Sequence, residues 1–170
     1  FLFNGCFSIF RPTPVLEDDK SDLLKIDKNF ILLNENLTPV ENPDFSNLDQ
    51  KVKSLQKAKS FYELNNLAVY GAKLSYIESS EEVFKKLQKE KPQEMVPFLN
   101  LLRVYYVLDE YDIAKQMLNN FYKVNVTNKS KIFEFMQYLK ATNRSEEYVI
   151  FLDVVSNYPE YEIKALEEIG

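Results

Sequence analysis

Hydrophobic side chains recur along this chain at a spacing of 34 residues. When Leu64, Phe98 and Ile132 are placed in register, six further rows of three positions fall into line. Those rows are Leu67/Leu101/Phe135, Ala68/Leu102/Met136, Gly71/Tyr105/Leu139, Ser80/Ala114/Tyr148, Phe84/Leu118/Leu152 and Leu87/Phe121/Val155. Of the 21 positions 19 are hydrophobic, more than twice the number expected from a hydrophobic content of 45%. A repeat of this length predicts a tandem array of helix pairs, an architecture that usually binds other proteins.

Within each repeat the apolar positions lie on one face of a helix. Phe98, Leu101, Leu102 and Tyr105 show the offsets of three, four and seven residues that a 3.6-residue period produces. Polar turns are expected between the paired helices at Ser79–Ser80, Asp109–Glu110 and Thr142–Ser145. Ser145 is the expected cap of the last of these helices, with Glu146 and Glu147 as acids that favour its positive end. The repeats are predicted at about 61–94, 95–128 and 129–160.

The array has expected extensions at both ends. Leu48, Val52 and Leu55 lead into the first repeat without a helix breaker, which predicts a single long helix over about 47–74. Residues Tyr161–Glu168 have the pattern of a final helix, and open-ended arrays need such a cap. The helical domain is therefore predicted to span residues 46–170.

Residues 7–45 are predicted to form an extended tether. They contain four prolines and the acidic run Glu17–Asp19, and they show no sustained helical period. The stretch Leu23–Leu33 is too apolar to remain solvated, so it is expected to dock on the helical domain. Two forms are open, a short helix or an extended strand-like piece, and it can cover either a groove or an edge.

The first six residues resemble a bacterial lipobox, in the relaxed form found in spirochaete lipoproteins. An apolar start is followed by Gly5, the small residue that the signal peptidase requires, and by Cys6, the single cysteine of the chain. The resemblance implies that residues 1–6 are a signal-peptide remnant and that Cys6 carries lipid. The alternative is a chance Gly-Cys pair. No stretch reaches the ~20 apolar residues that span a bilayer, so lipid is the expected membrane anchor.

The second repeat resembles the tetratricopeptide (TPR) signature. Its residues Phe98–Tyr106 supply the aromatic, Leu and Tyr of a first helix, and Glu110–Ala114 supply the small residue that opens the second. The resemblance covers about residues 61–160. It implies an all-α superhelical solenoid of three helix pairs, with the C-terminal helix as a cap and the N-terminal stretch as a tether. Tyr148 replaces the small residue of the Ala114 row, which puts a standard supertwist in doubt. The alternative is generic packing of a helical bundle.

In TPR proteins the first helices of successive repeats line a concave groove that holds a peptide or a partner helix. The resemblance places twelve residues there, among them Asn65, Val69, Leu99, Glu134, Gln137 and Lys140. The six predicted binding residues are Tyr62, Asn66, Asn100, Arg103, Tyr106 and Phe133. A carboxamide both donates and accepts, so Asn66 and Asn100 suit the main chain of an extended ligand. Solvated asparagines and surface aromatics are the alternative.

Composition argues against most other chemistry. The chain has no histidine, which excludes Ser-His and Cys-His nucleophiles and removes the main ligand of common zinc sites. Its three glycines are scattered, so no phosphate-binding loop is predicted, and a net charge of −5 disfavours nucleic acid. We therefore expect no enzymatic activity, catalytic residue, metal, cofactor or small-molecule substrate.

Together these features predict a protein–protein interaction scaffold anchored in the bacterial envelope. The expected partner is another envelope protein or an extended peptide, and the domain is expected in the periplasm, at the outer rather than the inner membrane. Lipobox, tether and TPR array together resemble the TPR lipoprotein subunit of the outer-membrane β-barrel assembly machinery, which usually carries five repeats. The alternative function is a periplasmic scaffold for cell-wall or virulence-associated partners.

Overall fold

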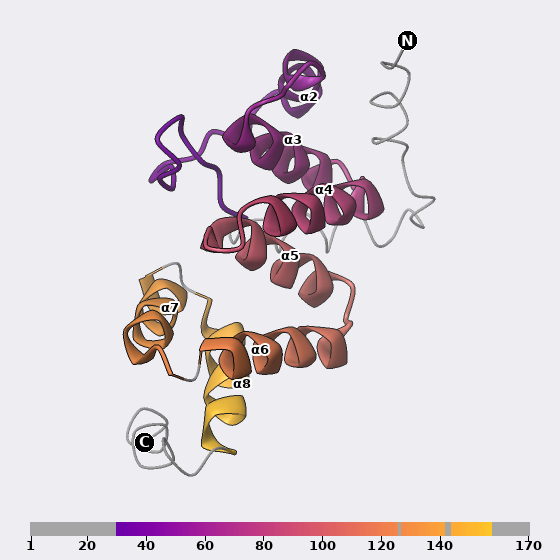
Figure 1. Cartoon of the computed structure of the whole chain (residues 1–170). Coiled ribbons are helices and arrows are strands. Elements are labelled where there is room, and N and C mark those ends of the chain that lie inside the picture. Colours follow the sequence, from indigo (N-terminus) through magenta and orange to yellow (C-terminus); the bar gives the residue numbers. More distant parts are fainter. Residues whose placement is uncertain (1–29, 126, 142–143, 158–170) are drawn as a thin grey trace. The chain divides into compact units, whose positions relative to one another are not determined.

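The computed structural model describes residues 30–125, 127–141 and 144–157 (Figure 1). These residues form seven α-helices and no named strand, which confirms the predicted all-α class. The one β-type pairing among them is an isolated antiparallel bridge between Leu33 and Pro39. The helices are α2 (Leu48–Leu55), α3 (Phe61–Lys73), α4 (Ile77–Glu90), α5 (Met95–Val107), α6 (Tyr111–Asn125), α7 (Lys129–Ala141) and α8 (Ser145–Ser156).

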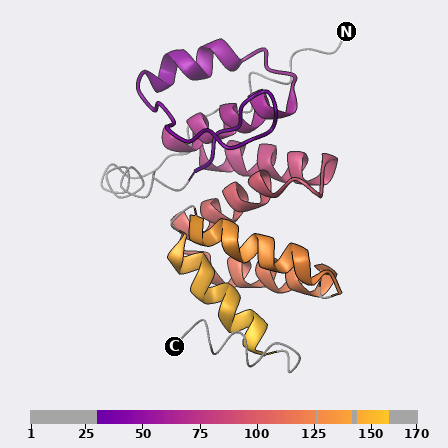
Figure 2. The same cartoon turned by 90° about the vertical axis from the view of Figure 1, so that its left-hand side faces the viewer.

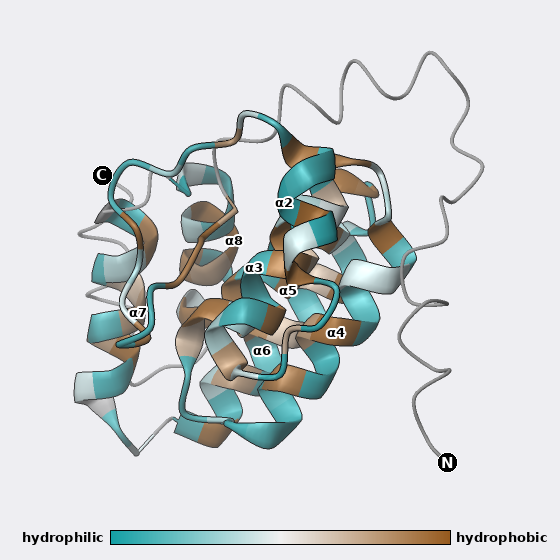
Figure 3. Cartoon of the chain, turned by 90° about the horizontal axis from the view of Figure 1, so that it is seen from above, coloured by the Kyte–Doolittle hydropathy of each residue, from teal (hydrophilic) through white to brown (hydrophobic). Residues whose placement is uncertain are grey.

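The helix starts repeat the 34-residue spacing of the sequence. Helices α3, α5 and α7 begin at residues 61, 95 and 129, and α4, α6 and α8 begin at residues 77, 111 and 145. Of the 21 positions in the hydrophobic rows, all but Leu64, Phe121 and Met136 are buried, and those three are half-buried. Hydrophobic and hydrophilic residues share every helix (Figure 3), as expected when one face is buried. The period therefore marks both the helix starts and the core.

The chain divides into two compact units between Val107 and Leu108. In the first unit α4 packs against α3 and α5, α3 also contacts α5, and α2 lies on α3 (Figure 2). In the second unit α6 packs against α7 and α8, and α7 packs against α8. The division falls inside the second predicted repeat. One continuous helical domain over residues 46–170 therefore stays a prediction.

The single helix expected over 47–74 is wrong, because the chain breaks between α2 and α3. Helix α3 starts after Ser60, whose backbone N–H and hydroxyl both donate to the Glu63 carboxylate, at 3.2 and 2.5 Å. These bonds hold the pKa of the Glu63 carboxyl below its ordinary value. The Ser-x-x-Glu spacing is a helix-start signal in the sequence, so the break was readable there.

One of the two expected turns differs from the structure. The first pair turns at Ser75, which has a left-handed φ of 66°, whereas Ser79 and Ser80 lie buried inside α4. Ser80 fits there because its hydroxyl donates to the Tyr76 carbonyl at 2.8 Å. The turn predicted at Asp109–Glu110 is confirmed, with Asp109 at φ 57°.

The start of α8 differs from the expected cap by one residue. Arg144 occupies the cap position and Ser145 is the first helical residue. Arg144 is fully buried and its guanidinium lies 3.7 Å from the Glu147 carboxylate, which is also buried. Glu147 was expected only as an acid that favours the positive start of this helix. Instead it is half of an internal ion pair, because a buried charge requires a partner.

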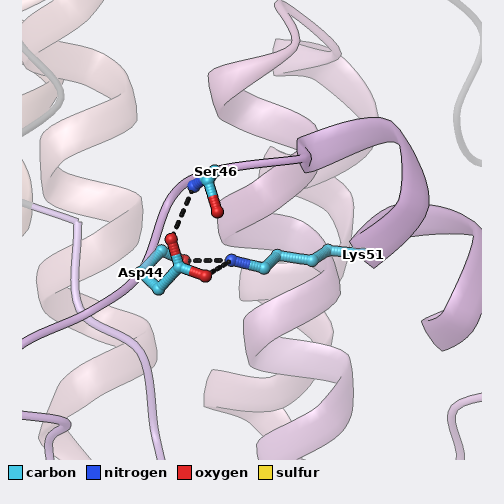
Figure 4. A network of polar contacts seen from close by, with 3 residues as sticks. All are labelled: Asp44, Ser46 and Lys51. Carbon is cyan, nitrogen blue, oxygen red and sulfur yellow. Dashed lines mark hydrogen bonds and ion pairs between the residues drawn. The ribbon is translucent and has the colours of Figure 1, made fainter.

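A polar network holds the chain where it enters α2 (Figure 4). The Asp44 carboxylate accepts from the Ser46 backbone N–H at 2.8 Å and from Lys51 Nζ at 2.6 Å, which holds the pKa of Asp44 far below its ordinary value. The neighbouring Phe45 ring lies against α3, edge-on to Tyr70 at 6.3 Å and 3.3 Å from Lys73 Nζ. Residues 44–46 are therefore fixed to α2 and α3.

Several expectations fall on residues outside the described parts of the chain. These are the lipobox with Cys6, the tether up to residue 29, residues 142–143 of the third turn and the capping helix Tyr161–Glu168. Among the described residues, no helix has the length and apolar content needed to cross a membrane.

Replacing Ala114 by Leu tests the packing of α6. Ala114 has no exposed surface, so added methylenes must displace its neighbours, and we expect the unfolding free energy to fall by about 1–3 kcal/mol. The measurement is urea denaturation followed by circular dichroism. Val124→Leu on the same helix is the matched control, because Val124 is 81% exposed and should tolerate the change. Equal stability of the two variants would contradict the packing of this helix.

Candidate functional site

Three asparagine side chains form the most specific polar feature of the first unit. Asn65 and Asn66 project from α3 and Asn100 projects from α5. Asn65 and Asn100 have no exposed surface, and Asn66 is half-buried. Carboxamides are seldom buried unless their hydrogen-bonding groups are satisfied, so such a cluster indicates a specific polar contact. We refer to these three side chains as the carboxamide groove.

The groove holds a segment of the same chain in extended form. Residues Phe30–Leu33, called here the docked segment, run beside α3 and reach α5; they are the first indigo residues in Figure 1 and can be followed in Figure 2. All four side chains are buried, with exposed fractions between 2% and 8%. Of the two forms left open for the stretch Leu23–Leu33, the described residues 30–33 have the strand-like one, and they cover the groove. Residues 23–29 lie outside the described parts of the chain.

Ile31 is bound through both of its main-chain groups. Its N–H donates to Asn100 Oδ1 at 2.8 Å, and its carbonyl accepts from Asn100 Nδ2 at 2.9 Å and from Asn65 Nδ2 at 3.0 Å. One carboxamide therefore pairs with the donor and the acceptor of one peptide residue, as the neighbouring strand of a sheet would.

Leu33 is bound in the same way, two residues further along. Its N–H donates to Asn66 Oδ1 at 2.8 Å, and its carbonyl accepts from Asn66 Nδ2 at 2.7 Å. The intervening Leu32 carbonyl accepts from the Val40 N–H at 2.9 Å, where the chain returns beside the segment. This alternation matches the two-residue period of an extended strand. The groove thus binds one edge of the segment and the returning chain binds the other.

The three carboxamides also fix one another. Asn100 Nδ2 donates to Asn65 Oδ1 at 3.0 Å, and Asn65 Nδ2 donates to Asn66 Oδ1 at 3.2 Å. Every amide oxygen therefore accepts and every amide nitrogen donates, which determines how each side chain is turned. Asn66 and Asn100 were predicted to bind the main chain of an external ligand, and in the structure both bind the main chain of the chain's own docked segment. Asn65 was on the wider groove face but was not singled out, because its repeat equivalent is the apolar Leu99.

The turn after the docked segment is closed by its own bonds. Asn34 Oδ1 accepts from the backbone N–H of Asn36 at 2.9 Å and of Thr38 at 3.1 Å, and the Asn34 N–H donates to the Thr38 carbonyl at 2.9 Å. Leu37 adopts a left-handed φ of 60° within it. An asparagine that bonds the backbone ahead of it is a usual turn device. The turn reverses the chain, so that the Val40 N–H can donate to the Leu32 carbonyl.

Burial and hydrogen bonding contribute differently to this site. Burying an apolar side chain stabilises by about 1.5–3 kcal/mol, whereas a hydrogen bond formed in place of one to water contributes about 0.5–1.5 kcal/mol. The four side chains of the docked segment therefore supply most of the attraction. The carboxamides determine the register of the segment. A shift of the segment by one residue along the groove would leave buried donors and acceptors unpaired.

The other predicted binding residues have varied surroundings. Arg103 is 5% exposed, with its guanidinium 5.7 Å from the ring of the half-buried Tyr106, and Tyr62 is also half-buried. Phe133 lies on α7 in the second unit and is 60% exposed. Cys6 lies outside the described residues. The structure therefore brings Asn66 and Asn100 together on one ligand-like segment and leaves the predicted roles of the remaining residues as predictions.

The site contacts its segment through hydrogen bonds with amide side chains. The three side chains that contact the segment's main chain are amides, which neither titrate nor act as nucleophiles. Within the described ranges, no group of three or more His, Cys, Asp or Glu residues is arranged to hold a metal ion. No protein-family model, curated protein or solved structure matches the chain.

Asn100→Ala tests whether the carboxamides hold the segment. The change removes three hydrogen bonds and leaves the Ile31 N–H without its acceptor, so we expect a stability loss of about 1–3 kcal/mol. Amide hydrogen exchange at residues 30–33 should become faster, which mass spectrometry of that peptide measures. Asn120→Ala is the control, because Asn120 is exposed on α6. Unchanged exchange in Asn100→Ala would show that side-chain burial alone holds the segment.

Proposed function

We propose that this chain is a protein–protein interaction module that binds extended peptide segments in its carboxamide groove. The observation that carries the proposal is the pairing of Asn66 and Asn100 with both main-chain groups of Leu33 and Ile31. Main-chain pairing supplies register, and apolar pockets for the side chains supply affinity, as in other modes of strand recognition. The groove is thus built to recognise backbone in extended form.

We also propose that the helices form a TPR-like solenoid of three pairs, with the tail helix as its cap. Two features support this architecture. The first helices and the second helices each start at intervals of 34 residues. Within each unit, helices that are neighbours in sequence pack together, as they do in a solenoid. In such an array α3, α5 and α7 line one face, which gives the two asparagines on equivalent helices a shared role.

Catalysis is outside this proposal. Acid–base and nucleophilic mechanisms need groups that titrate or attack near the operating pH, and the groove contacts its segment through amides. The chain also lacks histidine. An interaction role requires none of these groups and agrees with the acidic, lysine-rich composition.

For cellular context we propose a scaffold of the bacterial envelope, anchored through lipid on Cys6. The lipobox-like start and the proline-containing stretch after it support this placement. An accessory role in outer-membrane protein assembly is the specific form of the proposal, with the domain in the periplasm. A periplasmic scaffold for cell-wall or virulence-associated partners is the second form, and the identity of the bound protein separates the two.

Partner capture tests the proposed interaction role. The full chain, tagged at its C-terminus, is crosslinked in native membranes, purified and analysed by mass spectrometry beside Asn100→Ala and the control Asn120→Ala. We expect one envelope protein to be recovered with the wild type and the control, and about tenfold less with Asn100→Ala, a loss equivalent to about 1.4 kcal/mol of binding.

The captured protein then decides between the two cellular forms. A subunit of the barrel-assembly machinery would support the role in outer-membrane assembly, and a different envelope protein would support the alternative scaffold. Recovery that does not depend on Asn100 would contradict binding through the carboxamide groove.

Cys6→Ser tests the anchor separately from the groove. The serine hydroxyl does not accept the lipid, so the protein should move from the membrane fraction to the soluble periplasmic fraction. Fractionation followed by immunoblotting measures the change. Two or more acyl chains hold a protein firmly where a single chain holds it marginally, so the expected shift is nearly complete. Persistent membrane association would contradict the lipid anchor.

A further inference from the structure

The occupant of the carboxamide groove is the chain's own segment, and the bonds that hold it are not specific for its sequence. The asparagines contact the N–H and carbonyl of Ile31 and Leu33, groups that every residue except proline possesses. The four side chains of the segment are apolar and buried, so they make no hydrogen bonds of their own. Any extended apolar peptide can therefore make the same contacts.

We infer that the docked segment Phe30–Leu33 is an exchangeable internal ligand, and that the external partner is an extended apolar segment of another protein that displaces it. This inference rests on the proposed peptide-binding function and specifies the regulation and ligand of the same groove. The segment occupies the groove in its free form and sets a threshold for binding. A partner engages only when it outcompetes the chain's own residues.

The contacts define the chemistry of that partner. Two residues separated by one position need a free main-chain N–H, so proline is excluded at both. Four consecutive side chains must be apolar, because all four are buried in the docked segment. Alternate residues of a strand face opposite ways, so burial of all four means that both faces of the segment are covered. A polar–apolar alternating strand would place polar side chains in these buried positions.

The chain is built so that the docked segment can leave without disturbing the helices. The turn Asn34–Thr38 is exposed except at the half-buried Leu37, and its bonds described above are internal. After Val40, residues 41–43 connect to the fixed point formed by Asp44 and Lys51 at the start of α2. Glu41 and Asn42 in this connection are exposed. A hinge there would move the segment and its turn together, and the contacts of α3 with α2, α4 and α5 are made between the helices themselves.

The internal ligand lowers apparent affinity by a calculable factor. A binding-competent groove is present only in the fraction of molecules whose segment has left, and the apparent Kd rises by the inverse of that fraction. Docking in about 99 of 100 molecules would weaken external binding about 100-fold. The short connection favours such occupancy, since a short flexible linker gives an effective concentration in the mM range.

The test compares a groove whose own segment is prevented from docking with the wild type. In the undocked variant, Ile31→Asp and Leu33→Asp are combined in the full chain, because unpaired carboxylates resist burial in the sites of these apolar side chains. The probe is a fluorescein-labelled peptide with the sequence of residues 28–35, Lys-Asn-Phe-Ile-Leu-Leu-Asn-Glu. A control peptide carries proline in place of both residues that the asparagines read. Binding is measured by fluorescence anisotropy, and folding by circular dichroism.

We expect the undocked variant to bind the probe at least about tenfold more tightly than the wild type. Adding Asn100→Ala to that variant should weaken binding at least about tenfold, and the proline peptide should not bind. Equal affinity of the wild type and the undocked variant would overturn the internal-ligand inference and leave the peptide-binding function standing. Absence of binding by a folded undocked variant would overturn both. Binding that is insensitive to Asn100→Ala would place the peptide elsewhere and also overturn the inference.

A second measurement covers the case in which the undocked variant does not fold. A protease recognition sequence is inserted between Glu35 and Asn36, in the exposed turn of the otherwise wild-type chain, and is cleaved after folding. The released fragment is then held only by non-covalent contacts, those with the groove and those of Leu32 and Asn34 with the returning chain. Its replacement by the labelled peptide, followed by size-exclusion chromatography, would support the inference. A fragment that never exchanges, or helices that unfold when it leaves, would show that the segment is a permanent part of the core.

Discussion

The burial of two carboxamides constrains how the first unit is assembled. Asn65 and Asn100 have no exposed surface, and the carbonyl of Ile31 accepts from both of them. Without a peptide main chain at that place, these donors would need water, and the groove would have to remain open to it. Other buried residues of the same helices, Val69 on α3 and Leu99 on α5, are apolar and offer these donors no side-chain partner. The buried carboxamides are thus most stable when the main chain of an extended, apolar peptide lies against them.

The helices were largely predictable because each repeat places its buried apolar residues at the same positions. Rows of apolar residues 34 positions apart set which faces are buried, and the helix starts at 61, 95 and 129 follow the same interval. The wrong predictions concern where individual helices begin and where the turns lie. Hydrogen bonds between Ser60 and Glu63 fix the start of α3, and the spacing of hydrophobic residues carries no information about such bonds. The buried Ser79–Ser80 pair was mistaken for a turn because its polarity was weighed without its position in the hydrophobic row.

The site was predictable in part, for a different physical reason. The roles of Asn66 and Asn100 followed from carboxamide chemistry on equivalent helices, and the apolar stretch ending at Leu33 was expected to dock. The sequence did not predict that this stretch would dock on these asparagines. The contacts join residues 33 to 69 positions apart, and no local pattern specifies them. The extended form of the segment also depends on its partners, because hydrogen bonds from the groove replace those that a helix would supply internally. Arg144 and Glu147 show the same limit, since their charges gave no sign of burial.

The length of the peptide-reading part of the groove follows from the repeat itself. Asn66 on α3 and Asn100 on α5 occupy equivalent positions, and they read two residues separated by one, about 7 Å apart along an extended strand. The next equivalent position is Glu134 on α7, which is exposed. A carboxylate accepts hydrogen bonds but cannot donate to a peptide carbonyl, so it cannot pair with both main-chain groups of a residue as the two asparagines do. In the first unit, the side chains that pair with both main-chain groups of a residue are therefore Asn66 and Asn100, and a four-residue apolar segment is long enough to use both.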